Sequence, residues 1–313
     1  MILSDAPFFS KVSMGPSRGA AKWLVTEDNI KIRLGIWKSG TKGTVVIFPG
    51  RGEFIEKYGV AAELLEKRGY SVLAIDWRGQ GLSDRLLKNR SIGHIKKYSD
   101  YQKDVMATIK AFHSLKLPEP LYLLSHSMGG CIAMRSLVNE LPFKAAVFTS
   151  PMWGLSISPL AKLLSKIVAP LAKMGPLSTK VVPGGRTENY VLYTPFEKNV
   201  LTNSKNMYGR IKNQLNSYPE LMLGSPTLGW MYETLKECER LAKIIAPPVP
   251  SLVLVGSNET IIDTLAIRKR ISEWDIGKLV TVQNAKHELI MEVKKVRDQT
   301  VNLIGDFFEQ QIT

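Results

Sequence analysis

The sequence predicts an α/β fold in which a mostly parallel central sheet is flanked by helices. Short apolar runs with strand character alternate with longer amphipathic runs up to Pro151. This alternation then stops and resumes only at Ser251. One of the apolar runs, residues 121–126, leads directly into a serine, a methionine and two glycines that open a helix. These three observations predict one sheet with a helical insertion after its sixth strand.

The individual elements follow from residue periodicity and turn residues. A hairpin is expected at residues 22–26 and 30–37. After it we expect, in order, a strand ending at residue 48, a helix at 55–68, a strand at 71–76, a helix at 99–117, the strand and helix around residue 127, and a strand at 144–149. A buried strand at 251–256 and a strand near residue 280 precede a final amphipathic helix that ends near residue 310.

The segment between the two sets of strands has a different composition. Residues 152–245 are rich in Pro, Gly, Met and Tyr and contain helical stretches at 160–171 and 208–218. A chain of 313 residues, 44% of them hydrophobic, can bury one large core. We therefore expect residues 1–151 and 246–313 to form the core domain and residues 152–245 to form a lid or cap inserted into it.

Ser127 is the candidate nucleophile. A sharp turn between a strand and a helix strains the backbone of such a serine and lifts its hydroxyl clear of the sheet. Small residues two positions before and after the serine, here Ser125 and Gly129, let the helix and strand approach. Ser125 replaces the glycine usual in this pattern, and we interpret it as a tolerated variant. The alternative is a Ser/Gly-rich turn with no chemical role.

A serine nucleophile needs a general base, and in this arrangement the acid and then the histidine follow the serine in the chain. His287 is the single histidine after Ser127. Glu259 and Asp263 compete for the role of the acid on the loop after residues 251–256. We favour Glu259 as the residue that orients His287, because Asp263 is explained equally well as the N-cap of a following helix.

Two backbone N–H groups are candidates for stabilising the oxyanion that forms when a serine attacks a carbonyl. One is the amide of Met128, immediately after the nucleophile. The other is the amide of Arg51, in a loop with two glycines after the strand that ends at residue 48. An ordinary Pro-Gly turn would also tolerate this loop sequence.

Four motifs give the chain a resemblance to a known family. They are FPGRGEFIEKY at residues 48–58, DWRGQGLS at 76–83, SHSMGG at 125–130 and AKHEL at 285–289. The chain resembles α/β-hydrolases of the bacterial lysophospholipase and monoacylglycerol lipase family, which is serine aminopeptidase-like. The resemblance implies the α/β-hydrolase fold, Ser127 as nucleophile, Glu259 as acid and His287 as base. The turn DWRGQG is expected to be structural, with Arg78 paired internally.

This resemblance implies a serine hydrolase that cleaves the carboxylic ester of a single-chain lipid through an acyl-serine intermediate. Pro-Gly-Arg in the loop at residues 49–51 favours a lysophospholipid, and a monoacylglycerol lipase or a general carboxylesterase is the alternative. A proline iminopeptidase-like aminopeptidase would need an acidic cluster in the lid, where Glu188 and Glu197 are dispersed among basic residues. A catalytically silent binding protein is disfavoured, because it has no need of the three triad residue types.

We expect no cofactor and no metal, since the two cysteines, Cys131 and Cys238, are far apart in the chain. The net charge of +14 favours anionic partners, and we expect a membrane surface rather than nucleic acid. The apolar segment 155–172, with Lys162 and Lys166, is predicted either to lie among lipid head groups or to cover the active site. Without a signal sequence or an apolar span, we expect a cytoplasmic protein, in peripheral contact with the inner membrane face.

Overall fold

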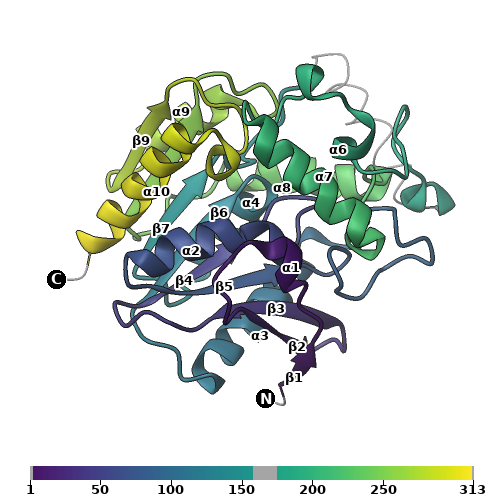
Figure 1. Ribbon diagram of the computed structural model, residues 1–313. Coiled ribbons are helices and arrows are strands. Elements are labelled where there is room, and N and C mark those ends of the chain that lie inside the picture. Colours follow the sequence, from purple (N-terminus) through teal and green to yellow (C-terminus); the bar gives the residue numbers. More distant parts are fainter. Residues whose placement is uncertain (1–2, 158–174, 312–313) are drawn as a thin grey trace.

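The computed structural model describes residues 3–157 and 175–311. A sheet of nine strands runs through the molecule in the order β1-β2-β3-β5-β4-β6-β7-β8-β9 (Figure 1). The strands are β1 (Ser4–Ala6), β2 (Ala20–Val25), β3 (Lys31–Trp37), β4 (Thr44–Phe48), β5 (Ser71–Asp76), β6 (Leu121–His126), β7 (Ala145–Thr149), β8 (Ser251–Gly256) and β9 (Gly277–Val282). The mostly parallel α/β sheet that the sequence predicts is therefore confirmed.

The sheet has an antiparallel part and a parallel part. β1, β2, β3 and β5 pair antiparallel with one another in that order, whereas β5, β4, β6, β7, β8 and β9 pair in parallel. Every residue of β4, β6 and β7 is buried. These strands are nearly continuous apolar runs because helices cover both of their faces.

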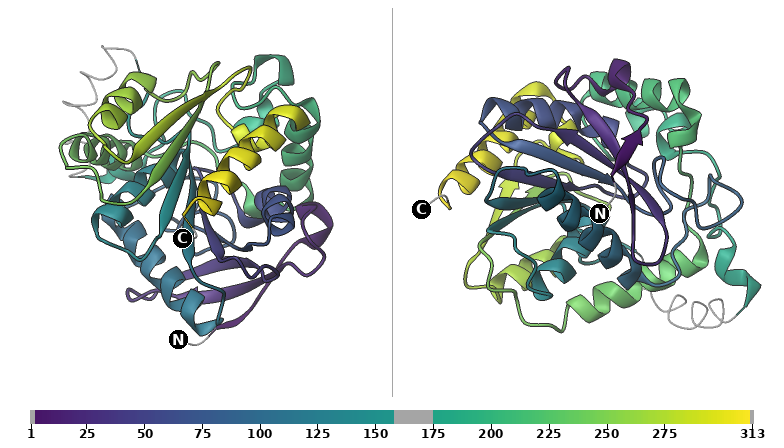
Figure 2. Two further views of the ribbon diagram at one scale, coloured as in Figure 1. Left: turned by 90° about the vertical axis from the view of Figure 1, so that its left-hand side faces the viewer. Right: turned by 90° about the horizontal axis from the view of Figure 1, so that it is seen from below.

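The helices form a layer on each side of the sheet. Val45 and Ile47 of β4 belong to an apolar cluster with α2 (Gly59–Lys67) and α10 (Lys294–Glu309). Val46 and Phe48 belong to a second cluster with α3 (Tyr101–Ser114), α4 (Met128–Val138), α8 (Leu228–Leu241) and α9 (Thr264–Ser272). Successive residues of a strand face opposite sides, so one strand anchors both layers (Figure 2).

The sequence prediction was wrong about the number of strands before the inserted segment. The inserted segment follows the seventh strand, β7, and not the sixth, because β1 adds a short strand at the edge of the sheet. β1 has three residues, two of them exposed, so it lacks the apolar alternation by which a strand is recognised. The hairpin of β2 and β3 and the strands up to β7 lie where the sequence predicts them.

The regular elements in the described part of the segment between β7 and β8 are helices. α6 (Tyr190–Tyr193) and α7 (Lys205–Ser217) lie together (Figure 1), whereas α8 packs against α4 in one of the two layers on the sheet. α7 begins three residues before the predicted helix at 208–218, because the Ser204 side chain accepts a hydrogen bond from the Met207 amide and caps it. The predicted helix at 160–171, with Lys162 and Lys166, lies outside the described residues.

One expectation about the core is confirmed. Arg78 is paired internally, with the buried Asp104 at 2.7 Å and the half-buried Asp28 at 2.8 Å, so these ion pairs hold the turn after β5. Cys131 and Cys238 are both buried free thiols.

Candidate active site

Ser127 occupies a strained turn between β6 and α4. Its φ of 49° and ψ of −116° lie outside the regions that residues with a side chain normally adopt. The turn is held by three backbone hydrogen bonds: the Ser127 amide donates to Thr149, and the Ser127 carbonyl accepts from Gly130 and Met152. The surrounding chain thus fixes a conformation that a serine would not adopt by itself.

The small residues around Ser127 have distinct reasons to be small. A Cβ atom on Gly129 would lie 2.0 Å from the Phe48 carbonyl oxygen, so helix α4 can approach β4 only with glycine there. Ser125 is fully buried in β6, and its hydroxyl donates to the Val147 carbonyl at 3.3 Å. A serine in place of the usual glycine therefore fits, because its one polar atom has an acceptor.

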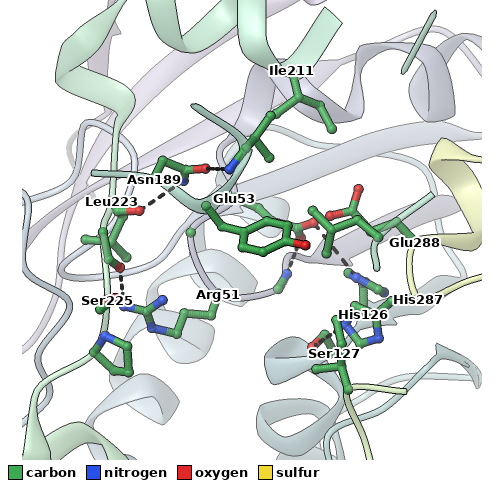
Figure 3. Close-up of a pocket in the computed structure, with 18 of the residues that line it drawn as sticks. Arg51, Glu53, His126, Ser127, Asn189, Ile211, Leu223, Ser225, His287 and Glu288 are labelled. Carbon is green, nitrogen blue, oxygen red and sulfur yellow. Dashed lines mark hydrogen bonds and ion pairs between the residues drawn. The ribbon is translucent and has the colours of Figure 1, made fainter. Parts of the chain in front are cut away.

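His287 is hydrogen-bonded on both ring nitrogens. Its Nε2 lies 3.0 Å from Ser127 Oγ, and its Nδ1 lies 2.6 Å from Glu259 Oε2. Figure 3 shows His287 beside Ser127 in the pocket. Glu259 follows β8 and His287 follows β9, so the loops after neighbouring parallel strands bring the two side chains together. A carboxylate on Nδ1 leaves Nε2 available to accept the proton of a serine hydroxyl.

Glu259, rather than Asp263, contacts His287. The second oxygen of Glu259 accepts from the Ile261 amide at 2.7 Å, and the side chain is only 1% exposed. Burial alone would raise the pKa of Glu259, but the hydrogen bond and charge of His287 and the Ile261 amide outweigh burial and lower it to about 2. Asp263 instead caps α9 by accepting from the Leu265 and Ala266 amides.

In the loop after β4, the backbone amides on either side of the Arg51 amide already donate hydrogen bonds to other groups. Gly50 donates its N–H to the Glu53 carboxylate, and Gly52 donates to the side chain of Gln80. Neither bond takes up the Arg51 N–H. The second candidate donor, the Met128 amide, lies in the first turn of α4, where backbone N–H groups lack intrahelical acceptors. Arg51 and its neighbours line the pocket that contains Ser127 and His287, and Ser127 directly precedes Met128.

Sequence reasoning missed a buried polar cluster in this pocket, formed by Glu53, Lys57, His126 and Glu288. Lys57 Nζ lies 2.6 Å from Glu53 and 2.8 Å from Glu288, and Glu53 also accepts from the Tyr58 hydroxyl at 2.6 Å. The spacing of Glu53 and Lys57 by four residues is the signal that could have predicted their ion pair. Glu288 could have been predicted only as a neighbour of His287.

Charges in this cluster are arranged around Lys57. Burial would raise the pKa of Glu53, but Lys57 and His126 lower it to about 2. Burial raises the pKa of Glu288, and it lowers the pKa of His126 to about 4, so His126 is neutral at pH 7. Ligand atoms of Glu53, His126 and Glu288 lie within 4.8 Å of one another, a grouping that could hold a metal ion. The Lys57 ammonium already supplies a positive charge to both carboxylates.

The rest of the pocket lining is mainly apolar. The whole pocket has a volume of about 300 Å³. Core and inserted segment both contribute apolar side chains to it, among them Phe54, Met152, Val191, Ile211, Leu223 and Trp230. An apolar pocket beside a serine and a histidine suits a substrate that combines a hydrocarbon group with a reactive carbonyl.

The fold and the contacts of Ser127 define the class as an α/β-hydrolase. The family described as "Serine aminopeptidase, S33" matches residues 39–294, and the chain belongs to this family. It is similar to lysophospholipase L2 of Escherichia coli strain K12, with 31% identity over 280 residues that cover 85% of this chain and 80% of that protein. It is also similar to the human monoglyceride lipase, with 28% identity over 174 residues that cover 53% of this chain and 56% of the lipase.

Solved structures share the fold. A soluble variant of monoglyceride lipase from Saccharomyces cerevisiae, solved with a substrate analog, superposes with a TM-score of 0.72 and 19% identity. The match covers 97% of this chain and 100% of that one. In the described part of this chain, none of the helices has the length and apolar character needed to span a bilayer.

Proposed function

We propose that this chain is a serine hydrolase that cleaves the carboxylic ester of a single-chain lipid, with Ser127 as nucleophile, His287 as general base and Glu259 as the acid. The observation that carries the proposal is the continuous pair of hydrogen bonds from Glu259 through His287 to Ser127. The similarity to lysophospholipase L2 and monoglyceride lipases supports a lipid ester as substrate. A lysophospholipid ranks first and a monoacylglycerol second.

The reaction proceeds in two steps. Ser127 Oγ attacks the ester carbonyl carbon while its proton passes to His287 Nε2, and the amides of Arg51 and Met128 hold the oxyanion. Collapse of the tetrahedral intermediate breaks the bond to the alcohol, which takes the proton from Nε2 and leaves an acyl-serine. Water then attacks the acyl group and gives a proton to Nε2. When this second intermediate collapses, the fatty acid leaves and Ser127 regains its proton.

The buried cluster of Glu53, Lys57, His126 and Glu288 argues against a peptidase function. An aminopeptidase would need free carboxylates to bind the amino group of its substrate. Two of the three pocket carboxylates, Glu53 and Glu288, are already paired with Lys57, and the third, Glu188, is a single exposed carboxylate rather than a cluster. The family description names aminopeptidases, but the relatives that cover most of this chain carry the names lysophospholipase L2 and monoglyceride lipase homolog.

We also propose that residues 152–245 act as a lid over this pocket and that the protein meets its substrate at an anionic membrane surface. The contribution of Val191, Ile211 and Leu223 to the pocket supports the lid, and the net charge of +14 supports the surface. Binding to vesicles should require anionic lipid and weaken as salt is raised. Equal binding to neutral and anionic vesicles would contradict the surface role.

The experiment that tests the activity is labelling with a fluorophosphonate, followed by hydrolysis assays. Lysophospholipid, monoacylglycerol, p-nitrophenyl ester and prolyl-amide substrates should be compared at equal concentration. Ser127→Ala should lose the label and about 10⁴- to 10⁶-fold in turnover. A Ser127→Ala protein that cleaves lipid esters at the rate of the unaltered enzyme would contradict the proposal, as would cleavage of the prolyl amide alone.

A further inference from the structure

The Arg51 side chain lies in the active-site pocket without a carboxylate partner among the described residues. Its Nη2 donates to the Gly224 carbonyl at 2.6 Å, and its guanidinium carbon lies 5.2 Å from the centre of the Trp230 ring. Its Nε is buried and has no hydrogen-bond acceptor in the described part of the chain. The side chain is thus positioned by a carbonyl and an aromatic ring, and its charge is left uncompensated.

The other cation of the pocket is in the opposite situation. Lys57 contacts two carboxylates, Glu53 and Glu288. Figure 3 places Arg51 beside Ser225, away from Glu53 and Glu288. Glu188, the remaining carboxylate of the pocket lining, is exposed, and no ion pair among the described residues joins it to Arg51.

An uncompensated charge in a partly apolar pocket is unfavourable unless a ligand supplies the opposite charge. Burial lowers the pKa of Arg51 to about 10, so the guanidinium is still charged at neutral pH. Guanidinium N–H groups are well suited to phosphate oxygens, because they form short charge-assisted hydrogen bonds with them. An anion of the phosphate type that enters with the substrate would supply the partner that Arg51 lacks among the described residues.

We propose that the Arg51 side chain binds the phosphodiester group of a lysophospholipid while the ester of the same molecule lies at Ser127. This inference rests on the proposed lipid-ester hydrolase function and specifies its substrate class. The number of covalent bonds between the backbone nitrogen and the guanidinium carbon of Arg51 is similar to the number between the ester carbonyl carbon and the phosphorus of a lysophospholipid. One residue can therefore hold the oxyanion with its backbone and the head group with its side chain.

The test compares two substrates that differ in the phosphate and share the ester. Lysophosphatidylglycerol and monoacylglycerol with the same acyl chain are presented in mixed micelles of a neutral detergent. In Arg51→Gln we expect kcat/KM to fall for both substrates, because the loop that contains Arg51 also carries the candidate oxyanion donor for both. We expect the ratio of kcat/KM for lysophosphatidylglycerol to kcat/KM for monoacylglycerol to fall at least tenfold. Arg51→Lys, which keeps the charge, should retain a larger part of this ratio.

A matched control removes the same charge elsewhere. Arg268 is an exposed arginine of α9, and Arg268→Gln should leave the ratio unchanged. A ratio that falls equally in Arg268→Gln would assign the preference to the net charge of the protein and overturn the inference, as would an unchanged ratio in Arg51→Gln. If the unaltered enzyme cleaves neither lipid, the proposed function itself fails.

Inhibition separates a lipid-borne phosphate from free phosphate. Glycerophosphoglycerol, the deacylated product, and inorganic phosphate are tested against monoacylglycerol hydrolysis by the unaltered enzyme and by Arg51→Gln. We expect glycerophosphoglycerol to inhibit the unaltered enzyme more strongly than Arg51→Gln. Inhibition by inorganic phosphate with none by glycerophosphoglycerol would indicate a free-phosphate site and overturn the assignment to the lipid head group.

Discussion

Lys57 and Glu288 form an ion pair of 2.8 Å inside the pocket that contains Ser127 and His287. Glu288 directly follows His287 in the chain, and Lys57 lies in the short helix that follows the Arg51 loop. The pair therefore connects the histidine loop to the loop with the candidate oxyanion donor. Both side chains are nearly inaccessible to water. Glu288 therefore depends on Lys57 to compensate its charge, whereas Lys57 is compensated by both Glu53 and Glu288.

Lys57→Met should destabilise the fold by about 3–5 kcal/mol, because it leaves Glu53 and Glu288 buried without a cation. Glu288→Gln added to that variant should recover part of the loss, since it removes one of the uncompensated carboxylates. Urea unfolding measures both effects. As a control, Lys67→Met removes an exposed partner of Glu63 and should cost no more than about 0.5 kcal/mol. Equal losses in the two methionine variants would show that the buried pair has no special role.

Glu259→Gln should reduce turnover by about 10³- to 10⁴-fold with little loss of stability, because an amide cannot stabilise a charged His287 in the same way. Asp263→Asn should keep nearly full activity, since asparagine is also a good N-cap and, among the described residues, the Asp263 side chain bonds only the start of α9. Steady-state hydrolysis of a soluble ester measures both. The opposite ranking would transfer the role of the acid to Asp263.

Gly129→Ala should prevent folding or cost more than about 3 kcal/mol, because the new methyl group would lie 2.0 Å from the Phe48 carbonyl oxygen. Gly209→Ala is the matched control, also in a helix, where a Cβ atom meets no atom within 4 Å. There alanine should stabilise the protein by about 0.5–1 kcal/mol. Thermal unfolding of the two variants checks the difference, and a well-folded Gly129→Ala protein would contradict the close approach of α4 to β4.

His126 should make the protein less stable in mild acid. Its folded pKa of about 4 lies below the ordinary value of 6.5, so the unfolded chain binds the extra proton first as the pH falls. This contribution is fully present above pH 6.5 and is lost between pH 6.5 and 4. It amounts to about 3 kcal/mol. Lys57 and His287 oppose protonation of His126, and Glu53, whose oxygen lies 3.9 Å away, favours it.

The measurement is urea unfolding of the unaltered protein and of His126→Gln at several pH values between 4 and 7.5. The stability of the unaltered protein should fall more steeply than that of the variant over the window from pH 6.5 to 4. Two parallel curves would mean that His126 titrates normally in the folded protein. Titrating groups that do not interact with His126 contribute equally to both curves.

The order of strands and helices was predictable from the sequence, since burial on both faces of a parallel sheet requires apolar runs such as β4 and β6. Ser127 and His287 were also predictable, because a strand that ends in a serine and two glycines is a local pattern and the histidine had no competitor after it. The short edge strand β1 was not predictable, since a strand of three mostly exposed residues has no periodicity.

The sequence favoured Glu259 over Asp263 as the acid, but the contact with His287 itself depends on the tertiary structure. Glu259 and Asp263 are both acidic residues on one loop, only four positions apart. Only the pairing of β8 with β9 places Glu259 against the imidazole and turns Asp263 toward the start of α9. The same holds for the charge of Arg51 and for the Glu53, Lys57 and Glu288 cluster. Periodicity and local motifs are properties of neighbouring residues, whereas compensation of a buried charge depends on residues that meet only when the chain is folded.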